Sequence, residues 1–372
     1  MRKNLAIITT HPIQYQVPLF KALLKVNELK PYVFYGCDQG VNKKKIDKDF
    51  NKKFSWNISM LSGYKYFFSK SNNNYDDWFL SFPNISKQLH KINCNCILIL
   101  GWNKIIYLQA IYYAIRKKIP LMLRCENNLN SNTNIFKKIF KKIFFRIFFS
   151  FFSKIFFIGK LNKSFYLHYG VKKSKLYSAP YFVDNNFFYK KKKNFKTFNI
   201  IFVGKFIKRK RPLDILRIAE ILKNYKKIQF TLIGDGPLLS DCQEWIRKKS
   251  LYNIHLGGFK NQLQLRKIYN QAHILINTSS YETWGLVVNE AMSAGLPCII
   301  TNKTGCAPDL IKNGKSGYTY PVGNLTVLKK YILKIYNNKK VYFRMSSNAK
   351  NIIQKYNVNK TVFSISKSIF SL

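Results

Sequence analysis

Short apolar runs alternate along the chain with longer segments in which apolar residues recur at helical spacing. In the first half, strand-like runs lie at 5–9, 31–35, 96–100, 121–124 and 154–158. Helix-like segments at 17–26 and 105–117 separate some of these runs. Apolar runs that alternate with amphipathic helices are typical of a parallel sheet with helices on its faces, so the pattern predicts an α/β domain.

The second half repeats this alternation. Strand-like runs lie at 199–204, 229–234, 254–258, 273–277 and 297–301. We predict four parts: an N-terminal acceptor-side domain at 1–184, a linker at 185–198, a C-terminal domain at 199–354, and a C-terminal helix at 355–372 that packs back on the N-terminal domain. The predicted fold class is α/β, with two doubly wound, Rossmann-like domains that face each other across a cleft, where open α/β sheets bind ligands.

Length and composition agree with a two-domain globular protein. The chain has 372 residues, 47% of them hydrophobic and 16% aromatic, which is enough for two cores. Seven cysteines are scattered, and the single C-x-C pair, Cys94 and Cys96, has no second pair at metal-site spacing. We therefore expect buried free thiols in a reducing cytoplasm. The N-terminus reads as a buried strand, and no apolar run reaches membrane-spanning length.

The net charge of +48 comes from 64 basic and only 16 acidic residues. Codon usage in an A/T-rich genome explains part of this excess, because lysine is abundant together with Asn, Ile, Phe and Tyr. The alternative is an anionic partner: a nucleic acid, a membrane surface or an anionic substrate. No nucleic-acid recognition motif is present, so we predict no specific nucleic-acid partner.

Residues 134–157 form an amphipathic segment rich in phenylalanine. Isoleucine and phenylalanine each recur every four residues, and the basic residues cluster beside them. Two interpretations stay open: a helix packed on the N-terminal domain, or peripheral contact of 134–152 with an anionic membrane surface.

Two carboxylates stand in the stretch SSYETWGLVVNEAMSAGLPCII (279–300), which is otherwise poor in charge. Glu282 follows a predicted strand and lies beside a helix start, whereas Glu290 lies one to two turns inside that helix. The first helical N–H groups are expected to bind an anion; they belong to Gly285, Leu286 and Val287. The alternatives are that Glu282 only favours the helix dipole and that Glu290 is solvated.

This segment resembles the Glu-x7-Glu motif of the family 4 retaining glycosyltransferases, which have the GT-B fold. The segments FVGKFIKRKRPLDIL (202–216), LIGDGPL (232–238) and DLIKNGKSGYTYP (309–321) are similar to further parts of that family. The N-terminal ITTHPIQYQVPLFKAL (8–23) looks like the opening of a branch that acts on envelope or surface glycans. The resemblance implies that Glu290 binds the donor ribose and that Glu282 contacts the hexose, since a carboxylate accepts hydrogen bonds from hydroxyls.

The same resemblance implies a cationic site for the nucleotide diphosphate. Lys205 and Lys210 stand where the family brings two cations to the leaving group, whose growing charge fixed cations stabilise. Gly234 and Gly236 are expected to form a tight strand-to-helix turn near the donor. They are not a dinucleotide fingerprint, because Leu239 occupies the third glycine position.

No cofactor or metal is predicted, because the nucleotide-sugar is a co-substrate. An Asp-x-Asp pair, Asp47 and Asp49, lies in a lysine-rich loop with no apolar strand before it, which argues against a metal site.

Acceptor-side candidates follow two strands of the first domain. His11 comes after the first strand and Glu126 after the strand at 121–124, so both are expected at the carboxyl edge of the sheet. Many family members have a histidine near the position of Glu126, and this chain does not.

The resemblance therefore implies a metal-independent retaining hexosyltransferase. It would move a sugar from a nucleotide-sugar to a hydroxyl of a lipid-linked or surface polysaccharide or lipopolysaccharide precursor. We expect the protein in the cytoplasm. Peripheral attachment to the inner face of the cytoplasmic membrane is the second of the two interpretations left open for 134–152. The alternatives are a nucleotide-sugar epimerase or phosphorylase on the same fold, a basic nucleic-acid-binding protein, and an inactive scaffold.

Overall fold

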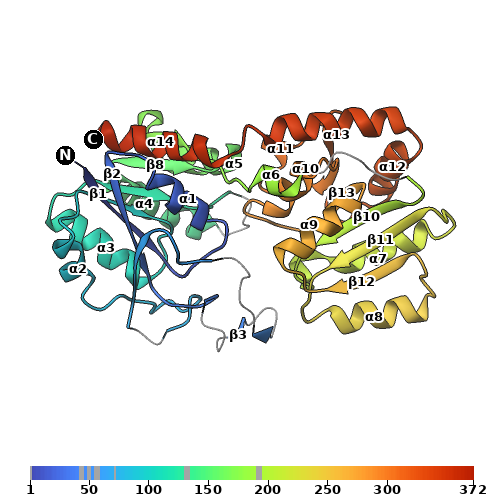
Figure 1. Ribbon diagram of the computed structural model, residues 1–372, viewed down its shortest axis with the longest axis horizontal. Coiled ribbons are helices and arrows are strands. Elements are labelled where there is room, and N and C mark those ends of the chain that lie inside the picture. Colours follow the sequence, from blue (N-terminus) through green and yellow to red (C-terminus); the bar gives the residue numbers. More distant parts are fainter. Residues whose placement is uncertain are drawn as a thin grey trace. The chain divides into compact units, whose positions relative to one another are not determined.

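The computed structural model describes residues 2–41, 46–47, 52–53, 59–70, 73–129, 135–189 and 195–372. These residues form two compact units, and Figure 1 shows the helices and strands of each. Unit 1 is built from the described parts of 1–45, 53–181 and 358–372, and unit 2 from those of 46–52 and 182–357.

Unit 1 contains a seven-stranded parallel sheet. In spatial order its strands are β5 (Lys65–Phe68), β2 (Leu29–Tyr35), β1 (Lys3–Thr9), β6 (Cys96–Ile99), β7 (Leu121–Arg124), β8 (Lys154–Phe157) and β9 (Leu176–Ser178). In β1 the four residues from Leu5 to Ile8 are all fully buried, and in register Ile7 lies opposite Val33 on one side and Leu98 on the other. Burial on both faces explains why these strands are continuous apolar runs.

Helices cover this sheet. They are α1 (Val17–Leu23), α2 (Ile85–Lys91), α3 (Ile105–Arg116), α4 (Ile135–Ser150), α5 (Lys160–His168) and α14 (Val358–Phe370). A short strand pair, β3 (Ile46–Asp47) with β4 (Lys52–Lys53), is described separately, as is the 3₁₀ turn Lys173–Lys175. Within the described residues, no helix is long and apolar enough to cross a membrane.

The predicted phenylalanine-rich helix is α4, and one side of it packs into the core. Phe145 and Phe149 are buried and lie against Phe165 of α5 at ring distances of 5.6 and 6.2 Å. The packing interpretation is therefore correct for this side of the helix, while other apolar side chains of α4 stay exposed.

The last helix, α14, is part of unit 1 although it follows unit 2 in sequence. Ile365 and Ile369 are fully buried, and the helix packs beside α1. The hydroxyl of Thr361 donates to the carbonyl of Pro180 at 2.8 Å, and Lys3 Nζ donates to the carbonyl of Ile369 at 3.0 Å. The two ends of the chain are thus joined in one core.

Unit 2 contains a six-stranded parallel sheet. Its spatial order is β12 (Ile254–Gly258), β11 (Ile228–Ile233), β10 (Phe198–Val203), β13 (Ile274–Asn277), β14 (Cys298–Thr301) and β15 (Gly317–Tyr320). Its helices are α6 (Asn185–Phe188), α7 (Pro212–Ile221), α8 (Leu239–Lys248), α9 (Gln262–Gln271), α10 (Leu286–Ser293), α11 (Ala307–Leu310), α12 (Leu325–Tyr336) and α13 (Lys339–Ile353). The 3₁₀ turn η2 (Lys208–Lys210) precedes α7. The strand order reverses between β10 and β13, which is where such sheets bind ligands.

The predicted linker at 185–198 differs from the structure at both ends. Asp184 caps α6 through bonds from two backbone N–H groups, Phe188 is 1% exposed, and Asn185 Nδ2 donates to the carbonyl of Ile353 at 3.1 Å. Phe198 already belongs to β10. The polar sequence hides this because one buried phenylalanine and one asparagine are sufficient to dock a single helical turn, whereas 190–194 lie outside the described residues.

We predict that Ile369→Ala loosens unit 1, because it leaves a cavity between α14 and the sheet. The opening free energy of β1, measured by hydrogen exchange of its peptides, should fall by about 2–4 kcal/mol. Phe363→Ala on the same helix is the matched control, since Phe363 is 65% exposed. Equal protection of β1 in wild type and Ile369→Ala would contradict this role of α14.

Candidate functional site

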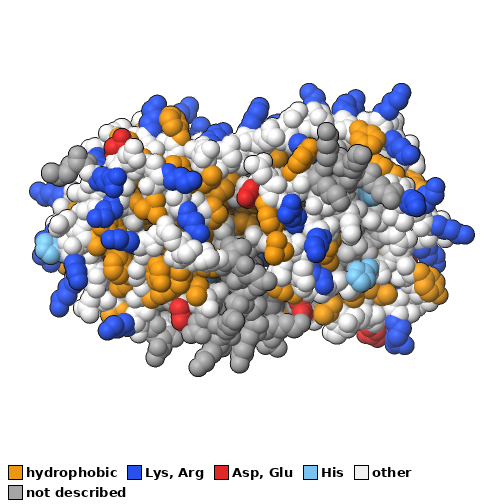
Figure 2. Space-filling view, in the orientation of Figure 1, with side chains coloured by type: hydrophobic (Ala, Val, Ile, Leu, Met, Phe, Trp, Pro, Cys, Tyr) orange, Lys and Arg blue, Asp and Glu red, His pale blue; other side chains and the backbone are white. Residues whose placement is uncertain are grey.

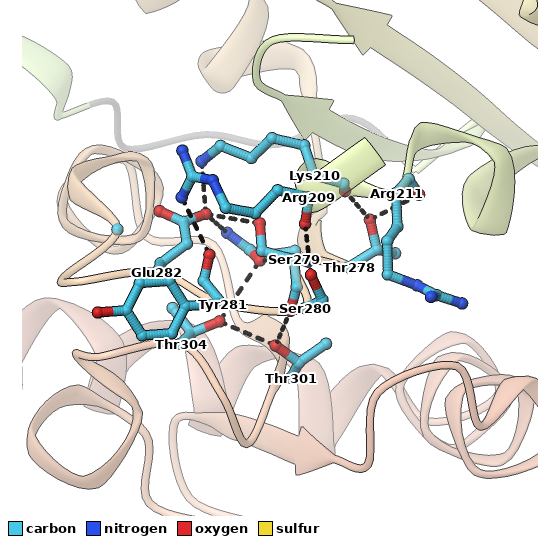
Figure 3. A network of polar contacts seen from close by, with 12 residues as sticks. Arg209, Lys210, Arg211, Thr278, Ser279, Ser280, Tyr281, Glu282, Thr301 and Thr304 are labelled. Carbon is cyan, nitrogen blue, oxygen red and sulfur yellow. Dashed lines mark hydrogen bonds and ion pairs between the residues drawn. The ribbon is translucent and has the colours of Figure 1, made fainter. Parts of the chain in front are cut away.

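Glu282 lies in the loop between β13 and α10, and its carboxylate is almost completely buried. Its Oε1 accepts three hydrogen bonds, from Lys210 Nζ at 2.6 Å, Ser279 Oγ at 2.7 Å and Asn277 Nδ2 at 2.9 Å (Figure 3). Lys210 is itself mostly buried, with 15% of its side chain exposed. The structure therefore brings together two of the residues that the sequence pointed to, as a buried ion pair.

The ion pair decides the protonation state of Glu282. Burial raises the pKa of the Glu282 carboxyl, but the charge of Lys210 and the bonds from Lys210, Ser279 and Asn277 outweigh burial and bring the pKa below its usual value. Glu282 is thus a charged acceptor at neutral pH.

The turn that carries Lys210 is fastened to the Glu282 loop by hydrogen bonds. Thr278 Oγ1 donates to the carbonyls of Lys210 and Arg211, at 2.7 and 3.0 Å, and Arg209 donates to the carbonyl of Tyr281 at 3.0 Å (Figure 3). The Arg211 side chain pairs instead with Asp214 at 2.6 Å. Arg209 and Arg211 therefore hold the turn in shape.

A third loop, after β14, closes the site from below in Figure 3. Thr301 Oγ1 donates to the carbonyl of Ser279 at 2.6 Å. The backbones of Thr304 and Glu282 pair as an isolated parallel β-bridge. A Cβ at Gly305 would lie 1.9 Å from the carbonyl oxygen of Thr283, so only glycine lets the two loops approach this closely.

Helix α10 begins directly beside the carboxylate. Gly285 is its N-cap and has a φ of +102°, a left-handed conformation that favours glycine. No side chain of the described residues caps this terminus. A Cβ at Gly285 would lie 3.4 Å from Glu282 Oε2. Leu286 and Val287 follow at the start of the helix, next to the charged pair, and their binding of an anion stays a prediction.

Glu290 is buried inside α10 and is 1% exposed. Its Oε2 accepts a hydrogen bond from the hydroxyl of Tyr269, on α9, at 2.9 Å. The alternative of a solvated helix residue is therefore wrong. The ribose role stays a prediction.

The GDG turn lies between β11 and α8, as predicted, and packs on the loop that follows β10. Phe206 N–H donates to the carbonyl of Asp235 at 2.8 Å, within a turn whose ends are Gly234 and Gly236. Lys205 is half-buried in the β10 loop. Its predicted contact with the diphosphate stays a prediction.

The acceptor-side candidates both lie at strand ends in unit 1. His11 follows β1, where its Nδ1 is 2.9 Å from Thr10 Oγ1 and its ring lies 4.5 Å from that of Tyr75. Glu126 follows β7 and accepts a bond from the Tyr181 hydroxyl at 2.7 Å. Burial, and then the charge of Glu126, raises the pKa of Tyr181 well above its usual value, so this hydroxyl keeps its proton and remains the donor.

Sequence reasoning missed the neutral residues that support the two carboxylates: Asn277, Ser279 and Tyr269. A signal existed for the first two, because the apolar strand β13 ends in the polar residue Asn277 and Ser279 lies two positions later. Tyr269 gave no signal, since only the tertiary structure brings its hydroxyl, on α9, to Glu290 on α10.

The described residues contain no group of three His, Cys, Asp or Glu side chains that could hold a metal ion. Asp47 lies in the short strand β3, and its partner Asp49 is outside the described residues. All seven cysteines are free and buried, and burial raises the pKa of Cys94 to about 11. These thiols are therefore unreactive core residues.

Residues 184–352 match a family model described as "Glycosyl transferases group 1". An uncharacterized glycosyltransferase of Methanocaldococcus jannaschii is 28% identical over 208 residues, which cover 55% of this chain and 53% of that protein. The UDP-Gal:alpha-D-GlcNAc-diphosphoundecaprenol alpha-1,3-galactosyltransferase of Escherichia coli is 28% identical over 177 residues, which cover 45% of this chain and 43% of the relative. The chain thus spans about half or less of the curated relatives it matches.

Among solved structures, Anabaena HepE in complex with UDP-glucose superposes with a TM-score of 0.73 over 99% of this chain and 100% of that chain, at 13% identity. This likeness extends to both units and confirms the GT-B fold class.

We predict that Lys210→Met destabilises unit 2 by about 3 kcal/mol at neutral pH, because it leaves the charge of Glu282 buried without its cation. Arg217→Met is the control, since Arg217 pairs with Asp214 at 3.0 Å but is 45% exposed, and it should cost less than about 1 kcal/mol. Urea denaturation measures both variants. An equal loss of unfolding free energy in the two variants would contradict a larger contribution from the buried Lys210–Glu282 pair than from the exposed Arg217–Asp214 pair.

We also predict a pH signature of Glu282. Its pKa is lower in the folded chain than in the unfolded chain, so its stabilising effect is present above the unfolded value and is lost as pH falls through the folded one. The stability difference between wild type and Glu282→Gln should be constant above about pH 5 and shrink steadily in more acidic buffer, where the unfolded carboxyl with a pKa of about 4.3 takes up its proton first. A difference that grows toward acid pH would reverse the assigned pKa shift.

Proposed function

We propose that this protein, in which residues 184–352 form a domain of the group 1 glycosyl transferases, moves a hexosyl group from a nucleotide-sugar to a sugar hydroxyl with retention of configuration. The acceptor would be a lipid-linked or surface polysaccharide precursor at the inner face of the cytoplasmic membrane. The observation that carries the proposal is the buried Lys210–Glu282 pair beside the uncapped start of α10.

The donor diphosphate would bind at that helix start. Backbone N–H groups at Gly285, Leu286 and Val287 supply donors and the positive end of the helix dipole, and Lys210 and Lys205 supply cations. As the sugar–phosphate bond breaks, negative charge grows on the diphosphate. Cations that are already fixed in position stabilise this charge without reorganising. The complex of UDP-glucose with HepE, a protein of the same fold, supports a nucleotide-sugar as the ligand class.

The ion pair prepares Lys210 to bind the diphosphate and Glu282 to bind the hexose. Lys210 keeps Glu282 ionised, so the carboxylate can accept bonds from the hexose hydroxyls while it holds the lysine head near the helix start. Ser279 and Asn277 fix the same carboxylate oxygen, which leaves Oε2 on the side of Gly285. Glu290, held by Tyr269, would bind the ribose hydroxyls.

Acceptor binding would involve unit 1, where His11 and Glu126 end two strands. The named acceptor of the Escherichia coli relative is a lipid diphosphate sugar, which supports a lipid-linked acceptor class for this chain. The alternatives of an epimerase, a phosphorylase or a nucleic-acid-binding protein draw no support from these matches.

We predict that the two glutamates separate in a thermal-shift and turnover experiment with UDP and UDP-sugars. Glu290→Gln should abolish most of the nucleotide-induced shift, whereas Glu282→Gln should keep much of the shift and lower turnover by at least about 100-fold. Each shift is measured against the same variant without ligand, because both side chains are buried. The opposite pattern would exchange the two roles, and an unchanged response of both variants would overturn the site.

A further inference from the structure

The outer side of α4 carries large apolar side chains that the fold leaves in water. Buried and exposed positions occupy separate arcs of this helix, with Phe145, Phe148 and Phe149 inside. The exposed fractions are 57% for Ile139, 72% for Phe140, 59% for Ile143, 41% for Phe144, 58% for Ile147 and 46% for Phe151. A run of this size on one helix is unusual for a protein surface that contacts only water.

Helix α3 repeats the arrangement. Ala110, Ile111 and Ala114 point into the same hydrophobic core as the buried side of α4. The outer positions are Leu108 at 42%, Tyr112 at 59% and Ile115 at 49% exposed. Trp102, just before α3, joins the two helices through ring contacts with Phe144 at 6.3 Å and Phe145 at 5.1 Å.

These helices are neighbours on one face of the sheet. Helix α3 connects β6 to β7 and α4 connects β7 to β8, and the three strands are adjacent and parallel. Right-handed crossovers place successive helices on the same face. Their exposed apolar residues therefore belong to one side of unit 1, which we call the α3–α4 surface.

The charge around this surface is entirely positive along the two helices. Neither 105–118 nor 135–154 contains an aspartate or glutamate. Lys142 and Arg146 are exposed beside the apolar arc of α4, and Arg116 to Lys118 end α3. Figure 2 shows Lys and Arg spread over the visible face of the protein, so charge alone marks no site; the apolar arcs single out this one.

We propose that the α3–α4 surface docks on an anionic lipid bilayer. Apolar side chains would enter the boundary between headgroups and acyl chains, and the flanking cations would meet anionic headgroups. Bilayer lipid fits better than a protein partner, because exposed cations lie beside an exposed arc of isoleucine and phenylalanine, the pattern of interfacial helices. Docking would bring unit 1 to the membrane in which the acceptor of the proposed function is anchored.

The test is co-sedimentation of the full chain with vesicles of phosphatidylcholine and phosphatidylglycerol in equal parts. Wild type should sediment with these vesicles. The triple variant Phe140→Ser, Ile143→Ser and Ile147→Ser should partition at least about tenfold less, since it loses three inserted side chains but keeps every charge. The matched control, Tyr252→Ser with Phe343→Ser, removes side chains that are 92% and 55% exposed in unit 2 and should bind as wild type.

A second pair of variants tests the charges: Lys142→Gln with Arg146→Gln should weaken binding more than Lys226→Gln with Lys227→Gln. Thermal melts of all variants check that folding is unchanged, as expected for exposed positions.

Wild type that stays in the supernatant, or a triple variant that sediments like wild type, would overturn the proposal. So would a wild-type dimer that the triple variant converts to monomer without vesicle binding, because a second copy would then cover the surface. Turnover of a soluble acceptor is assayed separately, so failure of docking and failure of the proposed function are distinguishable.

Discussion

The burial of one carboxylate organises the site of unit 2. A charged carboxylate removed from water costs several kcal/mol unless hydrogen bonds and an opposite charge replace the lost hydration. Glu282 obtains these from Lys210, in the turn before α7, from Asn277 at the end of β13 and from Ser279 in the loop after that strand. The requirement for charge compensation therefore fixes the positions of the loops relative to each other. A helix start, a cation and an anion are held ready in one place before any ligand binds.

The sequence predicted most of the fold, because a strand that is buried on both faces of its sheet consists of a continuous run of apolar residues. It also predicted the loop of Glu282 and the helix of Glu290, since Gly285 stands at the start of that helix and Gly295 and Pro297 follow its end. It did not predict the bonds that make these carboxylates tolerable inside the protein. Tyr269 lies 21 residues from Glu290, and only tertiary packing brings its hydroxyl to the carboxylate. The folded turn at Asn185–Phe188 was missed for the same reason, because its docking depends on Ile353, far along the chain.

The excess of basic residues shows that residue type alone does not reveal the role of a single cation. Among the cations of KFIKRKR, Lys210 pairs with Glu282, Arg211 with Asp214, and Arg209 bonds to a backbone carbonyl. Three adjacent cations thus have three different tasks that composition could not separate. The amphipathic pattern of α4 posed a similar problem. The sequence offered packing in the core and contact at the surface as alternatives. The helix has an arc suited to each, since Phe145 and Phe149 are buried whereas Phe140 and Ile143 are exposed.

The position of α14 has a consequence for synthesis. Lys3 Nζ donates to the carbonyl of Ile369, 366 positions further along the chain, so β1 cannot complete its contacts before α14 has been synthesised. Unit 2 is contained, apart from one short segment, within 182–357 and can complete its core earlier. Unit 1 therefore remains unfinished until 358–370 have been synthesised, with the surface beneath α14 uncovered. A nascent chain of this topology buries that surface only after α14 has emerged from the ribosome, so loss of α14 would leave the core of unit 1 exposed.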